Sequence, residues 1–464
     1  MTLRPYPEYR DSGLPWLGEI PAHWKKLAIK RLLSKMDYGT SANLGGVGNV
    51  RVLTMGHIQN GEIILPEVGN LDDVSPDLLL KTNDLLFNRT NSPELVGKVG
   101  IFRGTSEGKV SFASYLVRLR SETEHYPAYL NYLLNCAPFL RFARSQALVS
   151  LHQANLSSSR YSRIPVVIPP REEQEKIVAY LSARDRQIAR LIRAKQRLIE
   201  LLTEQKQAII HRAATRGLDP DAKMKQTGLD WLPEVPEHWE VKPLKYLVEN
   251  VNNQTATRSD DEIYVALENI ESWTGRITIL DEPPEFDSQV KRFQPGDVLF
   301  GKLRPYLAKV ARPPRSGVCV GELLVLRCRD SSILPEYLEV RLRSRQVIDL
   351  INSSTFGAKM PRADWGFIGS IALAFPKSRT EQKELLSFIA GETRTIDKAI
   401  ERARREIDLI REYRTRLVSD VVTGRLDVRG TKPPKVEDIE DPPGLEESLP
   451  PMLDDLVGES RTAP

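Results

Sequence analysis

Hydrophobic residues follow two different patterns along the chain, and each pattern occurs twice. In residues 1–170 and again in residues 218–376, short β-branched or alternating stretches are separated by Gly, Pro and Asn. Examples are residues 51–54, 62–65 and 276–280. Such stretches are typical of strands joined by turns, and each region closes with an apolar strand that ends in proline, at 166–170 and 371–376. Both regions are therefore predicted to be strand-rich domains.

A heptad pattern follows each strand-rich region and predicts a long helix. In the first helix, expected from about residue 171 to 214, Lys195 interrupts one apolar row, and Arg184 and Gln205 interrupt a second. The first row holds Leu181, Ile188, Leu202 and Ile209, and the second holds Ile177, Leu191 and Leu198. The row of the second helix holds Ile389, Ile396, Ala403, Ile410 and Leu417. Ser378 and Glu381 predict a capping box at its start.

Each predicted helix is about 65 Å long at about 1.5 Å per residue, which is too long for one domain to cover. Its apolar rows therefore need a partner, and the other helix is the natural one. We expect an α+β fold with two strand-rich domains joined by two long antiparallel coiled-coil helices. The domains are expected at opposite ends of the helix pair, related by a pseudo-twofold axis.

The amino-acid sequence also contains an internal repeat. Residues 13–24 return 215 positions later as residues 228–239, and a second stretch of the chain repeats at an offset of 208. A period near 210 residues is long enough for a domain with its own core, so the sequence predicts a tandem duplication. The predicted boundaries are 1–170 for the first domain, 171–217 for the first helix, 218–376 for the second domain, 377–427 for the second helix and 428–464 for a tail.

Composition narrows the class of protein. A chain of 464 residues that is 41% hydrophobic and 28% charged is expected to be a soluble protein of two or more domains. Neither a signal peptide nor an apolar run long enough to span a bilayer is visible, so no membrane association and a cytoplasmic location are expected. The three scattered cysteines, Cys136, Cys319 and Cys328, indicate neither a disulfide framework nor a zinc site.

The net charge of +4 is unevenly distributed. From Thr431 onward, nine acidic residues stand against three basic ones, so the rest of the chain is more basic than the total suggests. A basic folded part permits nucleic-acid binding without proving it. The acidic tail carries three Pro-Pro pairs and few apolar residues, and it is predicted to be disordered.

Three motifs together resemble the specificity subunit of type I restriction-modification systems. The first is Trp-Leu-x-Glu-Ile/Val-Pro-x-His-Trp at residues 16–24 and 231–239, and the second is the segment 84–102. The third is the Glu-Gln pair at each helix entry, Glu173-Gln174 and Glu381-Gln382. The resemblance covers residues 11–427 and implies two target recognition domains, each reading one half of a bipartite DNA site.

The resemblance also implies the partners. In this family the specificity subunit binds double-stranded DNA but is not itself an enzyme. Adenine methylation comes from methyltransferase (modification) subunits that bind S-adenosylmethionine, and cleavage comes from an ATP-driven restriction and translocase subunit. The chain is therefore expected to hold no cofactor or metal of its own, with S-adenosylmethionine, ATP and Mg²⁺ on the partner subunits.

Three polar loops in each repeat are candidate DNA contacts. The loop after the strand 85–87 offers Arg89, Thr90, Asn91 and Lys98, and the loop after 298–300 offers Lys302, Arg304, Tyr306 and Lys309. The stretch before the closing strand offers Gln153 and Asn155 in one repeat, and Lys359 and Arg362 in the other. The loop after the first strand offers Thr40, Ser41 and Asn43, against Gln254 and Thr255. Arg and Asn can read guanine and adenine edges in a bidentate manner, although most protein–DNA contacts go to phosphates.

Other motifs have simpler interpretations. Trp16, Trp24, Trp231 and Trp239 are predicted to pack at the domain edges, and His23 and His238 to be structural. The glycine-rich residues 45–48 lack the Lys-Ser/Thr of a phosphate-binding loop and are expected to form a turn.

The alternative function is a stand-alone DNA endonuclease or methyltransferase that acts as a pseudo-dimer. Asp77 with Glu107 and Lys109 formally fits a nuclease pattern, and residues 441–444 partly fit a methyltransferase loop. Neither occurs in both halves, whereas a catalytic pseudo-dimer should show matched acidic or nucleophilic clusters.

Overall fold

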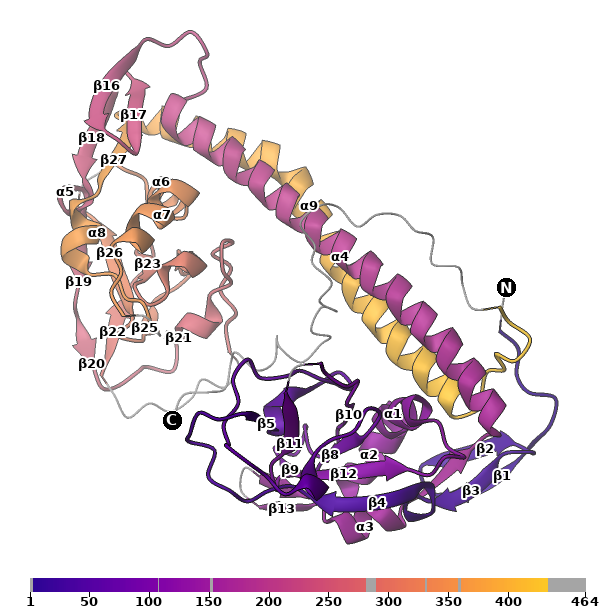
Figure 1. The fold of residues 1–464 in the computed structure, drawn as a ribbon. Helices are drawn as coiled ribbons and strands as arrows, with labels where there is room; N and C mark the ends of the chain where they lie inside the picture. The colour runs from indigo at the N-terminus through magenta and orange to yellow at the C-terminus, as the bar shows by residue number, and fades with distance from the viewer. Residues whose placement is uncertain are drawn as a thin grey trace. The chain divides into compact units, whose positions relative to one another are not determined.

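The computed structural model describes residues 3–106, 108–150, 153–280, 289–329, 332–357 and 360–432. The chain divides into two compact units, Met1–Gln196 with Arg405–Pro464 (unit 1) and Arg197–Arg404 (unit 2). Each unit combines a strand-rich part with a section of both long helices, α4 (Arg171–Arg216) and α9 (Arg379–Val422), as Figure 1 shows. The long helix predicted after the first strand-rich region is thus confirmed, within a mixed helix and strand fold.

Unit 1 is built around a six-stranded sheet with the order β4-β12-β8-β10-β7-β6. These strands are β4 (Leu33–Tyr38), β12 (Leu116–Ser121), β8 (Leu85–Asn88), β10 (Val99–Ile101), β7 (Glu62–Ile63) and β6 (Ile58–Gln59). A three-stranded sheet joins β13 (Leu148–Ser150), β14 (Gln153–Asn155) and β9 (Thr90–Asn91). The remaining pairs are β1 (Tyr9–Leu14) with β2 (Leu17–Pro21), β11 (Lys109–Phe112) with β5 (Val50–Leu53), and β15 (Pro165–Ile168) with β3 (Lys25–Ala28). The short helices are α1 (Pro127–Asn135), α2 (Ala137–Ser145), α3 (Ser158–Arg163), η1 (Ile29–Leu32), η2 (Met55–His57) and η3 (Pro76–Leu78).

Unit 2 contains two four-stranded sheets, ordered β19-β26-β23-β24 and β20-β22-β25-β21. Their strands are β19 (Val248–Val251), β26 (Leu323–Cys328), β23 (Val298–Gly301), β24 (Val310–Ala311), β20 (Gln254–Thr255), β22 (Val290–Phe293), β25 (Gly317–Cys319) and β21 (Ile263–Val265). The strand pairs are β16 (Met224–Leu229) with β17 (Leu232–Pro236), and β18 (Trp239–Pro243) with β27 (Ala372–Pro376). The short helices are α5 (Leu244–Leu247), α6 (Pro335–Leu342), α7 (Arg345–Ser353), α8 (Trp365–Ser370), η4 (Leu267–Asn269) and η5 (Pro305–Leu307).

Equivalent strands carry the core of each unit. All four residues of β8 and all four of β23 are buried. The aspartate just before each strand is also buried and accepts two hydrogen bonds from an arginine of the neighbouring strand, Asp84 from Arg120 and Asp297 from Arg327. A buried carboxylate is stable only when it is paired in this way, so the repeated Asp before the apolar run is a scaffold feature.

One predicted strand is wrong. Residues 276–280 form no strand, and only Ile277 makes an isolated bridge, to Ile270. Its apolar alternation resembles a strand locally, but Ile279 and Leu280 are exposed. Strand formation needs a neighbour to hydrogen-bond along the whole stretch, which the local sequence cannot supply.

The first turn of each long helix contacts the strand-rich part of its own unit through a glutamate, a tryptophan and a histidine, which occur in both units. In unit 1, Glu173 accepts hydrogen bonds from Trp24 Nε1 (3.0 Å) and Tyr6 Oη (2.6 Å), and contacts His23 Nε2 at 2.8 Å. In unit 2, Glu381 contacts Trp239 and His238 in the same way. Trp24 and Trp239 are fully buried, whereas Trp16 and Trp231 are only partly buried. The predicted packing role of the tryptophans agrees with these positions, and each histidine has an acidic partner far away in the sequence.

The capping box predicted for α9 is only half formed. Glu381 N donates to Ser378 Oγ at 3.4 Å, as a cap requires, but the Glu381 carboxylate turns to His238 and Trp239 instead of the Ser378 backbone. The Glu381 carboxylate is used in these tertiary hydrogen bonds because the buried indole N–H of Trp239 needs an acceptor.

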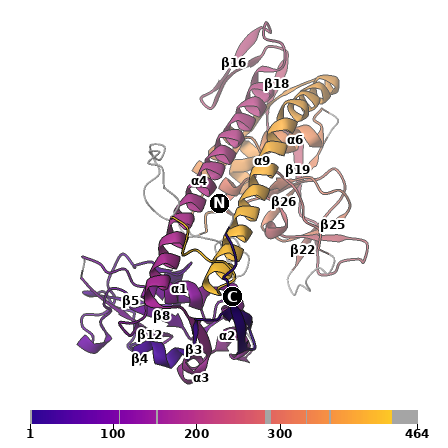
Figure 2. The ribbon, with the colours of Figure 1, turned by 90° about the vertical axis from the view of Figure 1, so that its right-hand side faces the viewer.

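The two long helices run antiparallel in both units (Figure 2). In unit 1, Asp185 of α4 pairs with Arg414 of α9 (2.8 Å), and Lys195 pairs with Glu406, so the residue order is reversed. In unit 2, Lys206 pairs with Asp397 at 2.6 Å. The α4 members of these pairs, Asp185, Lys195 and Lys206, occupy positions of the heptad seam. Polar pairs at such positions specify register and orientation at some cost in stability.

The second apolar row predicted for α4 is wrong beyond Ile177. Leu191 and Leu198 are exposed, and the seam instead continues through Asp185, Ile192, Ile199, Lys206 and Ala213. A row placed four residues before the first row and a row placed four residues after it fit the heptad equally well. The burial of Ile192 and Ala213, together with the ion pairs, shows that α4 packs through the row placed four residues after the first.

Among the described residues, no helix carries an apolar stretch that could cross a membrane.

Candidate nucleic-acid interface

In unit 1, the three candidate loops meet at the turn between β11 and β12. Ser114 N donates to Thr40 O (2.8 Å), and Arg89 N donates to Tyr115 O (3.1 Å). Arg89 O in turn accepts from Leu156 N at 2.8 Å, which connects the third loop. Loops that are separated by more than a hundred residues therefore form one cluster, which we call recognition cluster 1.

Side chains in recognition cluster 1 are held in place by one another. The Arg89 guanidinium lies 5.1 Å from the centre of the Tyr38 ring, and Arg89 Nη1 donates to Ser114 O at 3.4 Å. Asn155 Nδ2 donates to Thr90 Oγ1 at 3.0 Å, across the pairing of β14 with β9. Stacking on an aromatic ring restricts the arginine while leaving donors for a ligand.

The remaining candidates of unit 1 have different surroundings. Ser41, Asn43 and Gln153 are exposed, and Asn43 Oδ1 accepts from Gly45 N at 3.3 Å. Asn91 Oδ1 accepts from Ser92 N, so it stabilises the local turn. Burial, together with the nearby positive charge of Arg144, lowers the pKa of Lys98 to about 8.

In unit 2, two of the candidate loops meet at the corresponding turn between β25 and β26. Lys302 N donates to Glu322 O at 3.0 Å, and Ala363 N donates to Lys302 O at 2.9 Å. Arg304 N donates to Pro361 O at 2.7 Å, and Leu303 forms a bridge with Arg362. We call this group recognition cluster 2.

A strained turn presents Tyr306 in recognition cluster 2. Arg304 and Ala308, which flank η5, have φ values of 50° and 47°, in the left-handed region that favours glycine. Tyr306 lies between them and is exposed. Backbone strain at non-glycine residues concentrates at functional sites, where the surrounding contacts hold it.

The other candidates of unit 2 lie around this cluster. Gln254 and Thr255 form β20, whose neighbour Lys291 donates to the carbonyl oxygens of Gly321 and Leu323. Lys309 Nζ donates to Leu267 O at 2.7 Å. Lys359 lies outside the described residues.

Sequence reasoning missed the turns around which both clusters form. Tyr38, Ser114 and Tyr115 in unit 1, and Glu322 in unit 2, were not singled out. Tyr38 and Tyr115 are exposed aromatic residues at the end or start of apolar strands, a signal that could have identified them.

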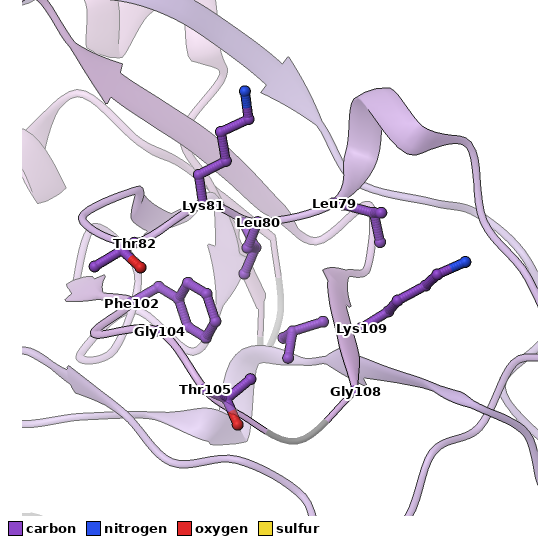
Figure 3. A pocket seen from close by; sticks show the side chains of 10 residues that line it. Leu79, Leu80, Lys81, Thr82, Phe102, Gly104, Thr105, Gly108 and Lys109 are labelled. Atoms are coloured by element: carbon purple, nitrogen blue, oxygen red, sulfur yellow. The ribbon is translucent and has the colours of Figure 1, made fainter.

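The features that suggested catalysis do not form a site in the described residues. Asp77 lies near Lys35 (3.8 Å), Lys109 lies near Asp73 (3.8 Å), and Glu107 and residues 441–444 lie outside the described residues. A cavity of about 420 Å³ is lined by both polar and apolar residues, among them Lys81, Phe102 and Lys109, and the Lys81 and Lys109 amines point away from the Phe102 ring (Figure 3).

Cysteine and metal chemistry also find no support in the described part of the chain. Burial raises the pKa of the Cys136 and Cys319 thiols to about 12, so neither is a ready nucleophile near neutral pH. No group of three or more His, Cys, Asp or Glu side chains with metal-binding geometry occurs in the described ranges.

Part of the chain is similar to a known protein family. Residues 24–201 match the family model of the type I restriction modification DNA specificity domain. The type I restriction enzyme MjaX specificity subunit of Methanocaldococcus jannaschii is 27% identical over 236 residues, which are 49% of this chain and 53% of that protein. The chain thus spans about half the length of the curated relative that it matches.

Among the solved structures compared, the one with a TM-score of 0.60 has a similar fold. This structure, from work on complex assembly and conformational transition of the type I R-M system, is 14% identical and covers 88% of this chain and 99% of that chain. The HsdS subunit from Thermoanaerobacter tengcongensis has a TM-score of 0.38 at 14% identity, covering 88% and 97%. The type I restriction-modification S subunit from M. genitalium has a TM-score of 0.34 at 13% identity, covering 91% and 99%.

Proposed function

The chain belongs to the type I restriction-modification DNA specificity family through the domain at residues 24–201, and from this we propose that it is the sequence-specific DNA-binding subunit of a type I complex. The resemblance noted in its motifs is confirmed at the level of the family. In the proposed complex, each unit reads one half of a bipartite duplex target. The chain directs methyltransferase and restriction subunits to that target and performs no chemistry itself.

One observation carries the proposal. In each unit, loops that are distant in sequence converge on the turn that precedes a central core strand. This strand is β12 in unit 1 and its counterpart β26 in unit 2. The scaffold contacts are shared, but the side chains differ. Arg89, Tyr38 and Asn155 form recognition cluster 1, whereas Lys302, Tyr306 and Arg362 form recognition cluster 2. Two different donor patterns on one scaffold suit two different DNA sequences.

Apolar side chains on the long helices provide surface for the modification subunits. Pairing of α4 with α9 leaves Leu191, Leu409 and Tyr413 exposed in unit 1, and Leu198, Leu201 and Phe388 exposed in unit 2. Large apolar side chains on the outer face of a paired helix are typical of a protein–protein contact. S-adenosylmethionine, ATP and Mg²⁺ belong to the partner subunits in this proposal.

The experiment compares the chain alone with its complex. Full-length protein is incubated with duplex DNA, Mg²⁺ and S-adenosylmethionine, with and without co-expressed modification subunits. The complex is expected to bind tightly and to methylate a bipartite site, whereas the isolated chain binds weakly and transfers no methyl group. Methyl transfer or strand cleavage by the isolated chain would contradict the proposal and favour an enzyme acting as a pseudo-dimer.

A further inference from the structure

Arg362 in recognition cluster 2 is oriented by a carboxylate. Its Nε donates to Glu322 Oε2 at 3.3 Å, and its Nη2 donates to Glu322 Oε1 at 3.1 Å. This pairing uses the side edge of the planar guanidinium. The end edge, formed by Nη1 and Nη2, keeps free N–H groups, and Nη1 makes no hydrogen bond within the described part of the chain.

The backbone around Arg362 is fixed on both sides. Arg362 bridges Leu303 of one candidate loop and Phe356 of the other, and it exchanges two backbone hydrogen bonds with Phe356 (3.2 and 3.1 Å). Glu322 O accepts from Lys302 N, so the carboxylate comes from the turn at the centre of the same cluster. The Arg362 side chain is nevertheless 44% exposed, so a ligand can reach its open edge.

We propose that Arg362 reads a guanine in the half-site bound by unit 2 and that Glu322 is its positioning residue. The open edge of the guanidinium matches the O6 and N7 acceptors of guanine in the major groove, which is the commonest specific contact of arginine with DNA. The inference rests on the proposed function and names the base class read at this site.

Glu322 also argues against a simple phosphate contact. Its negative charge partly neutralises Arg362 and would repel a phosphate brought to the same guanidinium, whereas the guanine edge is neutral. The corresponding turn in unit 1 carries Tyr115, whose carbonyl accepts from Arg89 N as Glu322 O accepts from Lys302 N. The two units therefore differ at this position, as residues that determine sequence preference should.

The test uses the full-length chain co-expressed with modification subunits and a library of randomised duplex DNA. Enriched sequences and methylated sites are compared for wild type, Arg362→Ala, Arg362→Lys and Glu322→Gln. Arg103→Lys with Glu62→Gln is the matched control, because Arg103 makes the same side-on pair with Glu62 (2.8 and 3.2 Å) and neither residue belongs to a recognition cluster.

We expect wild type to prefer G at one position of one half-site. Both Arg362 variants should reduce that preference about 10- to 100-fold while every other position is kept, since one bidentate contact discriminates by roughly that factor. Glu322→Gln should weaken the same preference by less, because the neutral amide still accepts one hydrogen bond. The control should change nothing, and melting curves confirm that each variant is folded.

Two outcomes overturn the inference while leaving the proposed function intact. In one, both Arg362 variants keep every base preference. In the other, they lose affinity uniformly, as loss of a phosphate contact would cause. A wild-type complex that enriches no sequence would instead contradict the proposed function itself.

Discussion

At the scale of single residues, Glu173 connects α4 to the opening strands of unit 1. It accepts hydrogen bonds from Tyr6 and Trp24 and contacts His23, and its side chain is only 6% exposed. Burial and the Glu173 carboxylate raise the pKa of the Tyr6 hydroxyl well above its usual range. Glu381 plays the same part in unit 2 without a tyrosine and is 26% exposed.

Glu173→Ala is therefore expected to destabilise unit 1 by about 3 kcal/mol, because two buried donors lose their acceptor and water cannot easily replace it. Glu381→Ala should cost less, about 1–2 kcal/mol, because only one buried donor, the Trp239 indole, loses its acceptor and His238 is exposed. Calorimetric unfolding of both variants measures the difference. Equal losses, or a larger loss for Glu381→Ala, would show that burial does not set the strength of this contact.

The lowered pKa of Lys98 gives a pH test of the proposed DNA contact. A lysine is charged below its pKa, and the pKa of Lys98 is lowered to about 8 by burial and by Arg144, so its charge disappears between pH 7 and pH 9. An ordinary lysine keeps its charge in this range. If Lys98 contacts a phosphate, affinity should fall up to about tenfold from pH 7 to pH 9. Lys98→Arg should remove this fall in fluorescence titrations; an identical pH dependence in that variant would exclude Lys98 from the contact.

At the scale of elements, the sequence predicted the α9 row and the first row of α4 but not the second row of α4. Leu191 and Leu198 are more hydrophobic than Asp185 and Lys206, so a search for apolar residues selects the wrong positions. The charged residues enter the seam because α9 supplies a partner of opposite charge at each. That information is non-local, as is the missing neighbour of residues 276–280.

Adjacent positions on α4 test the revised seam. Ile192 is 3% exposed and Leu191 is 45% exposed. Ile192→Ala should cost about 2–4 kcal/mol, because it leaves a cavity in the helix pair, whereas Leu191→Ala should cost under about 1 kcal/mol. Thermal unfolding compares the two variants, and the reverse order would restore the row first expected from the sequence.

Charge exchange tests the polar pair in unit 2. Lys206→Glu places two carboxylates together at a position where Lys206 Nζ lies 2.6 Å from Asp397 Oδ1. We expect a loss of about 1–2 kcal/mol for the single variant. The double variant Lys206→Glu with Asp397→Lys should recover most of it. A double-mutant cycle with no coupling energy would mean that the pair does not contribute to helix register.

At the scale of the whole molecule, the sequence located the candidate loops but not the turns that gather them. Arg89, Thr40 and Asn155 were predicted separately. They become one cluster because β14 pairs with β9, and because the turn between β11 and β12 hydrogen-bonds Thr40 and Arg89. Tyr115 accepts from Arg89 N, and Glu322 accepts from Lys302 N, through backbone carbonyls, and such contacts are not visible in a sequence motif. The two units present different side chains on shared scaffold contacts.

The central claim is that each unit reads its own half-site, and exchange of one unit's recognition part tests it most directly. Residues 1–170 are replaced by the corresponding segment of another family member that retains Pro21, Trp24 and Tyr129, because Gly424 approaches the first two and Val422 O accepts from Tyr129 Oη (3.2 Å). Methylated sites are mapped by sequencing for the complex formed with modification subunits. The account predicts one changed half-site and one unchanged half-site, with the reciprocal result when residues 218–376 are exchanged. Simultaneous change of both half-sites, or of neither, would contradict it.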